Sequence, residues 1–210
     1  MNKRLSLLAF YLISLSVVSS VTVLAESAVG VKEGDWIEYT ITYTGSPATQ
    51  FPEWIRIEIK NVQGTGITAD VTVERLDGSS NTSSGTFDLD IGVPDLLAIS
   101  ANLDTGDEFY HEDYGNTVIA GTEDETYAGA KRTVVYATVN RIELRWDKAT
   151  GILLQSDQST DNFTQNLRVD KTNLWQTQIF GLDPTLFYVA VVGIIVIIAF
   201  VTFSLIRRRK

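Results

Sequence analysis

The sequence predicts a mainly β protein with a large curved antiparallel sheet or half-barrel and a short helical segment. One C-terminal transmembrane helix follows this domain. Three observations predict this fold. Apolar and polar residues alternate with period two in segment after segment. Turn residues separate these segments roughly every 10 to 15 residues, a spacing typical of antiparallel sheets. An apolar stretch without a charged residue, 185–206, lies near the C-terminus.

Residues 1–25 have the pattern of a secretory signal peptide. Lys3 and Arg4 give a positive start, an apolar run covers 5–18, and Ala25 follows Val23 at the spacing of a cleavage site. We expect cleavage after Ala25. The alternative is an uncleaved signal anchor, since apolar residues continue up to the cleavage site. In both cases the segment that follows is expected to be translocated.

Residues 26–174 are expected to form one extracytoplasmic antiparallel β domain. In the first strand Ile37, Tyr39 and Ile41 share one face, and polar residues occupy the alternate positions. The same pattern predicts nine strands in all, at 36–44, 54–62, 67–74, 87–91, 117–121, 131–139, 141–146, 152–156 and 162–169.

Two segments interrupt the strand pattern. Residues 77–85 are rich in Gly, Ser, Asn and Thr, a composition that predicts a polar loop. Residues 95–101 predict one or two helical turns, with Asp95 as the N-terminal cap. Trp146 lies on the apolar face of its strand and is expected in the core.

The C-terminal part of the chain predicts a membrane anchor. Residues 175–184 form a short juxtamembrane linker, and 185–206 would span about 33 Å as a helix, enough to cross the hydrocarbon core of a bilayer. A buried core helix is the alternative, but the run is apolar on all sides. The basic tail 207–210 predicts a cytoplasmic C-terminus. We therefore expect a single-pass protein of the cell membrane, with its N-terminal domain outside.

Composition narrows the function classes. The absence of cysteine excludes disulfides, thiolate metal sites and a lipoprotein-type lipid anchor. Six of the 17 basic residues lie at the two ends, so the segment between them carries 11 basic and all 26 acidic residues, a net charge of about −15. A field of this sign repels nucleic acid. We expect no nucleic-acid partner, no cofactor and no metal centre.

Four segments carry a resemblance to known proteins: 33–39, 101–107, 126–136 and 146–153, which together span most of the β domain. They resemble an uncharacterised family of archaeal surface proteins with a signal peptide, a β domain and a C-terminal membrane helix. The last two segments are also similar to the terminal hairpin of half-barrel lipoprotein-carrier-like domains, in which a curved sheet wraps a helix or a lipid. The sequence lacks the lipidation cysteine of many carrier-like relatives. The resemblance implies a fold and a location, and it carries over no catalytic residue.

Two acidic clusters are candidate cation sites, because carboxylate oxygens suit a hard ion such as Ca²⁺. The first also contains the only histidine, His111. An ordinary solvated acidic loop is the alternative, and no EF-hand spacing is present. The first cluster consists of Asp104, Asp107, Glu108, Glu112 and Asp113, and the second of Asp88, Asp90 and Asp95.

Four other residues are candidates for binding or modification. By strand parity Trp36 and Trp54 lie on the polar face, where an aromatic pair could form a platform for a glycan or a peptide. The alternative is that each packs beneath a loop. Asn81 and Asn162 begin N-x-S/T glycosylation sequons, and Asn81, in the predicted loop, is expected to be the better acceptor if the host glycosylates.

No catalytic motif of the common hydrolase, metalloprotease or nucleotide-binding types is present. We therefore expect a non-enzymatic, membrane-anchored binding or scaffolding domain of the cell envelope, with a protein, glycan or lipid partner. The alternative is a lipid- or hydrophobe-binding carrier-like domain, which predicts an apolar cavity in the concavity of the sheet. A surface hydrolase would need a carboxylate pair, for which Glu53 with Glu58, or Glu123 with Glu125, are the candidates.

Overall fold

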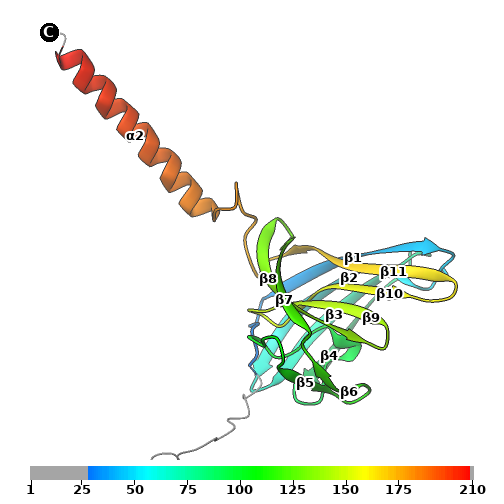
Figure 1. Cartoon of the computed structure of the whole chain (residues 1–210). Helices are drawn as coiled ribbons and strands as arrows, with labels where there is room; N and C mark the ends of the chain where they lie inside the picture. The colour runs from blue at the N-terminus through cyan, green and yellow to red at the C-terminus, as the bar shows by residue number, and fades with distance from the viewer. Residues whose placement is uncertain (1–27, 209–210) are drawn as a thin grey trace, which may run out of the picture.

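The computed structural model describes residues 28–208, and within this range the chain is mainly β with one C-terminal helix. This confirms the predicted fold class (Figure 1). The strands are β1 (Trp36–Gly45), β2 (Pro52–Gln63), β3 (Gly66–Arg75), β4 (Ser80–Asp88), β5 (Glu108–His111), β6 (Gly115–Val118), β7 (Gly121–Tyr127), β8 (Ala130–Val139), β9 (Ile142–Asp147), β10 (Leu153–Ser159) and β11 (Phe163–Thr172). A 3₁₀ turn η1 (Pro94–Leu96) and helix α2 (Pro184–Arg208) complete the chain.

Nine strands form one antiparallel sheet in the order β4-β3-β2-β1-β11-β10-β9-β8-β7, and β5 pairs with β6 separately. The sheet consists of two meanders that meet where the first strand pairs with the last. In this central pair Tyr39 lies opposite Val169, and Ile41 lies opposite Leu167. The period-two pattern therefore places apolar residues of both meanders on one face, and right-handed strand twist curves the sheet around that face.

The two ends of the sheet are distinct, and we name them by their relation to α2. At the anchor end β1 begins and β11 ends, and the chain leads on toward α2. At the far end β1 finishes at Gly45 and β11 begins at Phe163, opposite each other. Figure 1 shows β1 and β11 side by side between the anchor end and this far end, with β1 pointing away from α2.

The concave face is covered by the long connection between β4 and β5. Its apolar residues Leu96 and Ile99 are buried against the sheet. The indole Nε1 of the buried Trp146 donates to the Leu96 carbonyl at 2.8 Å, and the Ile99 amide donates to the Gly151 carbonyl at 2.9 Å. Gly151 has a φ of 72°, and a Cβ at this position would clash with the Ile99 carbonyl. Glycine is therefore required for this close approach.

Four expectations about this domain were wrong in detail. The predicted strand 87–91 continues only to Asp88, where β4 ends, and a turn follows. The predicted loop 77–85 is largely strand β4, a sheet-edge strand whose polar residues form cross-strand pairs such as Thr72 with Thr82. The predicted strand 117–121 is divided between β6 and β7. Asp95 is not a helix cap, because it lies inside η1 with a φ of 56°, and Val93 precedes the turn without a side-chain cap. Polar edge strands and irregular turns carry little hydrophobic periodicity, so the pattern missed them.

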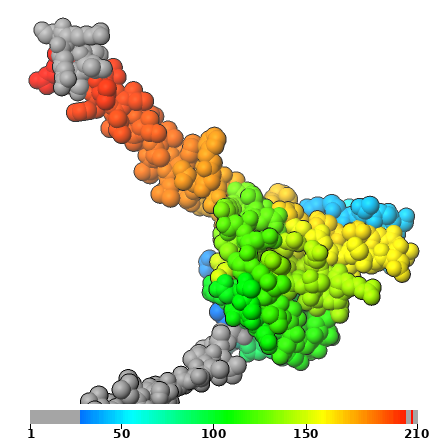
Figure 2. All heavy atoms as spheres, viewed as in Figure 1, coloured from blue at the N-terminus to red at the C-terminus, as the bar shows by residue number. Residues whose placement is uncertain are grey.

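Helix α2 agrees with the predicted span 185–206. Its window Pro184–Phe203 has 20 residues, a mean hydropathy of 2.9 and no burial against the rest of the protein. Figure 2 shows the helix standing clear of the β domain. One helix of the described chain can therefore cross a membrane, which fits a single-pass membrane protein. The proposed signal peptide 1–25 lies outside the described residues.

The linker before α2 is held against the β7–β8 hairpin. The Trp175 indole Nε1 donates to the Tyr127 carbonyl at 3.1 Å, and the Gln178 amide donates to the Gly129 carbonyl at 2.8 Å. The guanidinium carbon of Arg132 lies over the Trp175 ring, 4.7 Å from its centroid. These contacts hold the linker against the anchor end of the sheet a few residues before α2 begins.

Candidate binding pocket

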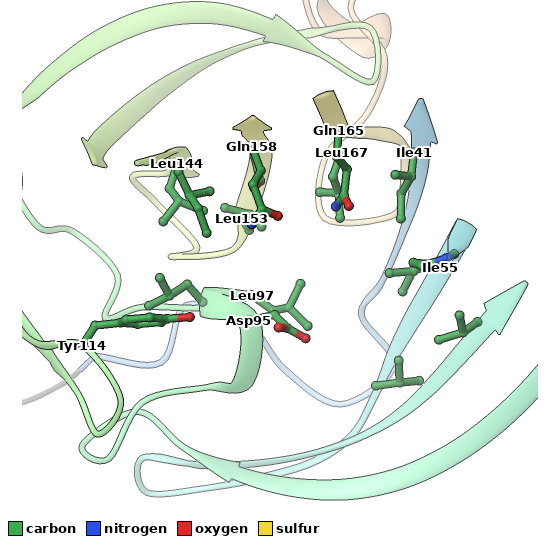
Figure 3. Close-up of a pocket in the computed structure, with 16 residues that line it drawn as sticks. Ile41, Ile55, Asp95, Leu97, Tyr114, Leu144, Leu153, Gln158, Gln165 and Leu167 are labelled. Atoms are coloured by element: carbon green, nitrogen blue, oxygen red, sulfur yellow. The ribbon is translucent and has the colours of Figure 1, made fainter. Parts of the chain in front are cut away.

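A cavity of about 320 Å³ lies in the concavity of the sheet (Figure 3). Its size is at the lower end of small-molecule sites, roughly 300 to 1,000 Å³. Most of the wall is aliphatic, and it is formed by strands of both meanders together with η1. The aliphatic lining residues are Ile41, Ile55, Val71, Val73, Leu96, Leu97, Ile142, Leu144, Leu153 and Leu167.

Strand register explains where the pocket lies. Two rows of residues cross four neighbouring strands and point to the concave side. The inner row is Ile41, Leu167, Ser156 and Leu144, and the row nearer the far end is Tyr43, Gln165, Gln158 and Ile142. Toward the anchor end, the β4–β5 connection approaches the sheet through Val93, Leu97 and Ala98. The cavity that remains between the connection and the sheet there has a volume of only about 30 Å³. The connection thus fills one half of the concavity, and the pocket occupies the half toward the far end.

Five polar residues line this otherwise apolar pocket: Asp95, Tyr114, Ser156, Gln158 and Gln165. Gln158 and Gln165 are direct cross-strand partners. Figure 3 shows their amide ends pointing from β10 and β11 into the cavity, and Asp95 projecting from η1 on the opposite side. Among the described residues none of the five side chains has a hydrogen-bond partner within the protein. Their hydrogen-bonding capacity is therefore available to a ligand or to water.

Aromatic rings continue the concave surface beyond the pocket at the far end. Tyr43, Phe51 and Phe163 form a cluster with ring centroids 5.1 to 6.1 Å apart. The Tyr43 hydroxyl donates to the carbonyl of Pro52, a lining residue, at 2.6 Å. All three rings are partly exposed. They provide an apolar rim next to the pocket, where a hydrophobic ligand would first make contact.

The residues of the first predicted cation cluster do not converge. Asp104 forms an ion pair with Lys148 at 2.6 Å, and Asp107 accepts from the Asp104 amide at 2.7 Å. Glu108, Glu112 and Asp113 are exposed. Across residues 28–208 no group of three or more His, Asp or Glu side chains is arranged to hold a metal ion. In the second cluster Asp88 accepts from the Asp90 amide at 3.0 Å, whereas Asp95 lines the pocket.

His111 has a structural role that the sequence did not indicate. It is buried, its Nε2 lies 3.1 Å from the Val93 carbonyl, and its Nδ1 lies 3.1 Å from the Asp113 amide nitrogen. A carbonyl can only accept and a backbone amide can only donate, so Nε2 carries the proton and Nδ1 accepts. The ring thereby connects β5 to the β4–β5 connection, and Gly92 leaves space for it.

Trp36 and Trp54 lie on the convex face, as parity predicted, but they do not contact each other. Trp36 pairs with Glu58 and Trp54 pairs with Thr40, so four residues of strand, about 13 Å, separate them. The Arg56 guanidinium covers the Trp36 ring at 4.5 Å. The two rings therefore offer separate surfaces, and Trp54 lines a shallow depression with Glu53 and Glu74.

Three of the four carboxylates considered for hydrolysis, Glu58, Glu123 and Glu125, lie on the convex face and are engaged by cations. Glu58 binds Lys60 at 2.6 Å, and this hydrogen bond and charge hold the pKa of Glu58 below its usual value. Glu123 and Glu125 pair with Arg145 and Arg168, each at 3.2 Å. A carboxylic acid that acts as a general acid near neutral pH needs a raised pKa. The pKa of Glu58 is lowered, so its surroundings do not suit that role.

The two sequons are both exposed, but their settings are reversed from expectation. Asn81 lies in β4 opposite Val73, whereas Asn162 lies in the turn between β10 and β11. Accessibility in a turn favours Asn162 as the better acceptor.

An apolar cavity was expected only for the alternative hypothesis of a hydrophobe-binding domain, and of its five polar residues the sequence analysis named only Asp95, as a candidate cation ligand. For Gln158 and Gln165 the sequence held a signal. Both glutamines occupy positions that the alternation of apolar and polar residues assigns to the inner face of their strands. Asp95 and Tyr114 come from irregular segments without periodicity. A comparison with models of protein families finds no match, and a search of curated proteins finds no relative.

Proposed function

We propose that this protein is a membrane-anchored, non-enzymatic binding domain of the cell envelope, and that it holds a hydrophobic ligand such as a lipid chain in the concave pocket. The observation that carries the proposal is the pocket itself, an aliphatic cavity of about 320 Å³ in the concavity of the sheet. A hydrophobe-binding domain requires such a cavity, and a protein-scaffolding domain does not.

The sequence supports an extracytoplasmic location for this domain. The secretory pattern of residues 1–25 and the basic tail 207–210 both favour a cytoplasmic C-terminus with the β domain on the other side. The resemblance to archaeal surface proteins and to half-barrel carrier-like domains is consistent with this location and with a bound lipid. α2 supplies the lipid-bilayer partner in this proposal.

The linker contacts support a defined relation between pocket and bilayer. Trp175 and Gln178 hold the anchor end of the sheet near the start of α2. The row containing Gln158 and Gln165 lies toward the far end. The pocket is thus directed away from the anchor, and its ligand would exchange with an envelope partner on that side of the molecule.

Filling the cavity tests the proposal. The substitution Val73→Trp adds an indole at the pocket wall, and the matched control Thr72→Trp adds one to the opposite face of the same strand. The full chain in lipid nanodiscs is exposed to an alkyl diazirine probe, and cross-linked peptides are mapped by mass spectrometry.

We expect the native protein and Thr72→Trp to be labelled at pocket residues such as Ile55 and Leu167, and Val73→Trp to lose most of this labelling. Labelling of α2 by probe dissolved in the bilayer serves as the internal reference. Equal pocket labelling in Val73→Trp, or labelling of α2 alone in the native protein, would contradict the proposed function.

The anchor is tested separately by deleting 185–210. The native protein should stay with washed membranes, and the deletion variant should be released, provided that the mature N-terminus begins at Glu26. Retention of a variant with that N-terminus would show that α2 is not the anchor.

A further inference from the structure

We propose that the pocket selects an amphiphile whose polar end donates hydrogen bonds and carries no negative charge. This inference rests on the proposed function and specifies the class of ligand. Fatty acids and phosphate-bearing lipids are disfavoured, whereas hydroxyl-, amide- or amine-ended chains are accepted. The inference depends on the charges of the lining residues, on their free hydrogen-bonding groups and on their positions.

The charge of the pocket wall is the first argument. Among the described residues that line the cavity there is no lysine or arginine, and Asp95 is the one charged side chain. Two arginines of the neighbouring strands lie on the convex face, where Arg56 pairs with Glu38 at 2.6 Å and Arg168 pairs with Glu125 at 3.2 Å. Arg75, at the end of β3, lies opposite the lining residue Pro52 but does not itself line the cavity. Proteins that bind carboxylate or phosphate groups typically supply an arginine, a lysine or a helix N-terminus. This wall supplies a carboxylate instead.

The hydrogen-bonding inventory is the second argument. The Asp95 carboxylate can only accept, so a group that binds it must donate. The amides of Gln158 and Gln165 can donate and accept, and neither is satisfied by another described residue. A hydroxyl, amide or ammonium group can satisfy both kinds of partner. A ligand carboxylate would find amide donors but would also face Asp95 without a cation between them.

The positions of these groups give the ligand an orientation. The amides project from β10 and β11, and Asp95 projects from η1 on the other side of the cavity (Figure 3). Both amides belong to the cross-strand row nearer the far end, whereas Ile41, Leu167 and Leu144 belong to the inner row. The polar end of the ligand therefore lies between the amides and Asp95, and the chain lies against the inner row.

Three alkyl diazirine probes of one chain length, ending in a hydroxyl, an amine or a carboxylate, test this selectivity on the full chain in nanodiscs of neutral lipid at pH 7. Pocket labelling is divided by α2 labelling to correct for partition into the bilayer. We expect the carboxylate probe to label the pocket roughly three- to tenfold less than the hydroxyl probe, as expected for two like charges facing each other at a partly hydrated site. The amine probe should equal or exceed the hydroxyl probe.

The substitution Asp95→Asn removes the charge and keeps a residue that tolerates the positive φ of this position. It should raise labelling by the carboxylate probe several-fold toward the level of the hydroxyl probe. Asp161→Asn, an exposed change of the same charge in the β10–β11 turn, should leave all three probes unchanged.

The outcomes separate the two proposals. The selectivity is overturned, while a hydrophobe site remains, by either of two results. One is that the carboxylate probe labels the pocket as well as or better than the hydroxyl probe. The other is that Asp95→Asn does not raise labelling by the carboxylate probe. An absence of pocket labelling by every probe, with α2 labelled normally, overturns the proposed function itself.

Discussion

The buried ion pair between Arg132 and Asp147 connects the sheet to the linker before α2, and breaking it should destabilise the domain strongly. The Asp147 side chain is 1% exposed and binds the Arg132 Nε and Nη2 atoms at 2.8 and 3.0 Å. The same carboxylate accepts from the Thr150 amide and hydroxyl at 3.0 and 2.7 Å. On its other side, Arg132 covers Trp175 of the linker.

The substitution Arg132→Met keeps much of the side-chain volume and removes the charge. Asp147 then remains buried with two of its four hydrogen bonds, a situation that costs about 3–5 kcal/mol. Loss of the cation–π contact with Trp175 adds about 0.5–1 kcal/mol. The matched control is Lys148→Met, which breaks the neighbouring Lys148–Asp104 pair, where the side chains are 27% and 63% exposed. An exposed pair contributes about 0–1 kcal/mol.

Pulse proteolysis of the full chain in nanodiscs, across a urea series, measures both effects. With an m-value of about 2 kcal/mol/M for a domain of this size, Arg132→Met should lower the unfolding midpoint by about 2 M, and Lys148→Met by less than about 0.5 M. Cleavage within 173–183 should also accelerate in Arg132→Met under native conditions. Equal midpoint shifts for the two variants would refute the reasoning, because burial would then not distinguish the pairs.

Three further predictions use the same assay. Gly151→Ala should cost about 3 kcal/mol or more, because a Cβ there clashes with the Ile99 backbone, whereas Gly64→Ala, also at positive φ but with open space around it, should cost only about 1 kcal/mol. Trp146→Phe should cost about 2–4 kcal/mol and increase hydrogen exchange in 94–101, because the buried Leu96 carbonyl loses its donor; unchanged exchange there would argue against this role. Burial raises the pKa values of Tyr39 and Tyr127 above the ordinary value of 10.0, so their stabilising effect is complete below about pH 10 and is lost as the pH rises further. Tyr39→Phe should therefore weaken the alkaline loss of stability, while costing about 1–3 kcal/mol at pH 7 through the unpaired Leu153 carbonyl.

Much of the fold could be predicted from the sequence because strand period and membrane-helix hydropathy are local signals. Ile37, Tyr39 and Ile41 indicated a buried face that the structure confirms, and the uncharged run 185–206 indicated α2. Strand order was not predictable, because the pairing of β1 with β11 joins residues as far apart in the sequence as Ile37 and Thr172, close to the whole length of the domain. Trp146 was correctly expected in the core, but its hydrogen bond to Leu96 depends on a segment without periodicity.

The candidate site was less predictable than the fold, for a physical reason. A pocket exists where the β4–β5 connection stops covering the sheet, and that point is set by long-range hydrogen bonds. The acidic cluster from Asp104 to Asp113 attracted attention by its density in the sequence, but the chain directs those side chains to separate partners. Asp95 was considered as a helix cap and as a cation ligand, and nothing in the sequence indicated that it is the charged residue that lines the cavity.

The same hydrogen bonds indicate that the pocket is preformed. The connection is held at Leu96 by Trp146, at Leu97 and Ile99 by the backbone around Gly151, and at Asn102 by the Lys148 carbonyl. Each of these contacts involves β9, β10 or the turn between them, so the connection cannot shift toward the far end without breaking several at once. Collapse into the cavity would also bury the amides of Gln158 and Gln165 without partners, which costs about 1–3 kcal/mol for each group. The fold thus keeps an apolar space open by restraining the segment that could fill it and by lining the space with polar groups that resist burial.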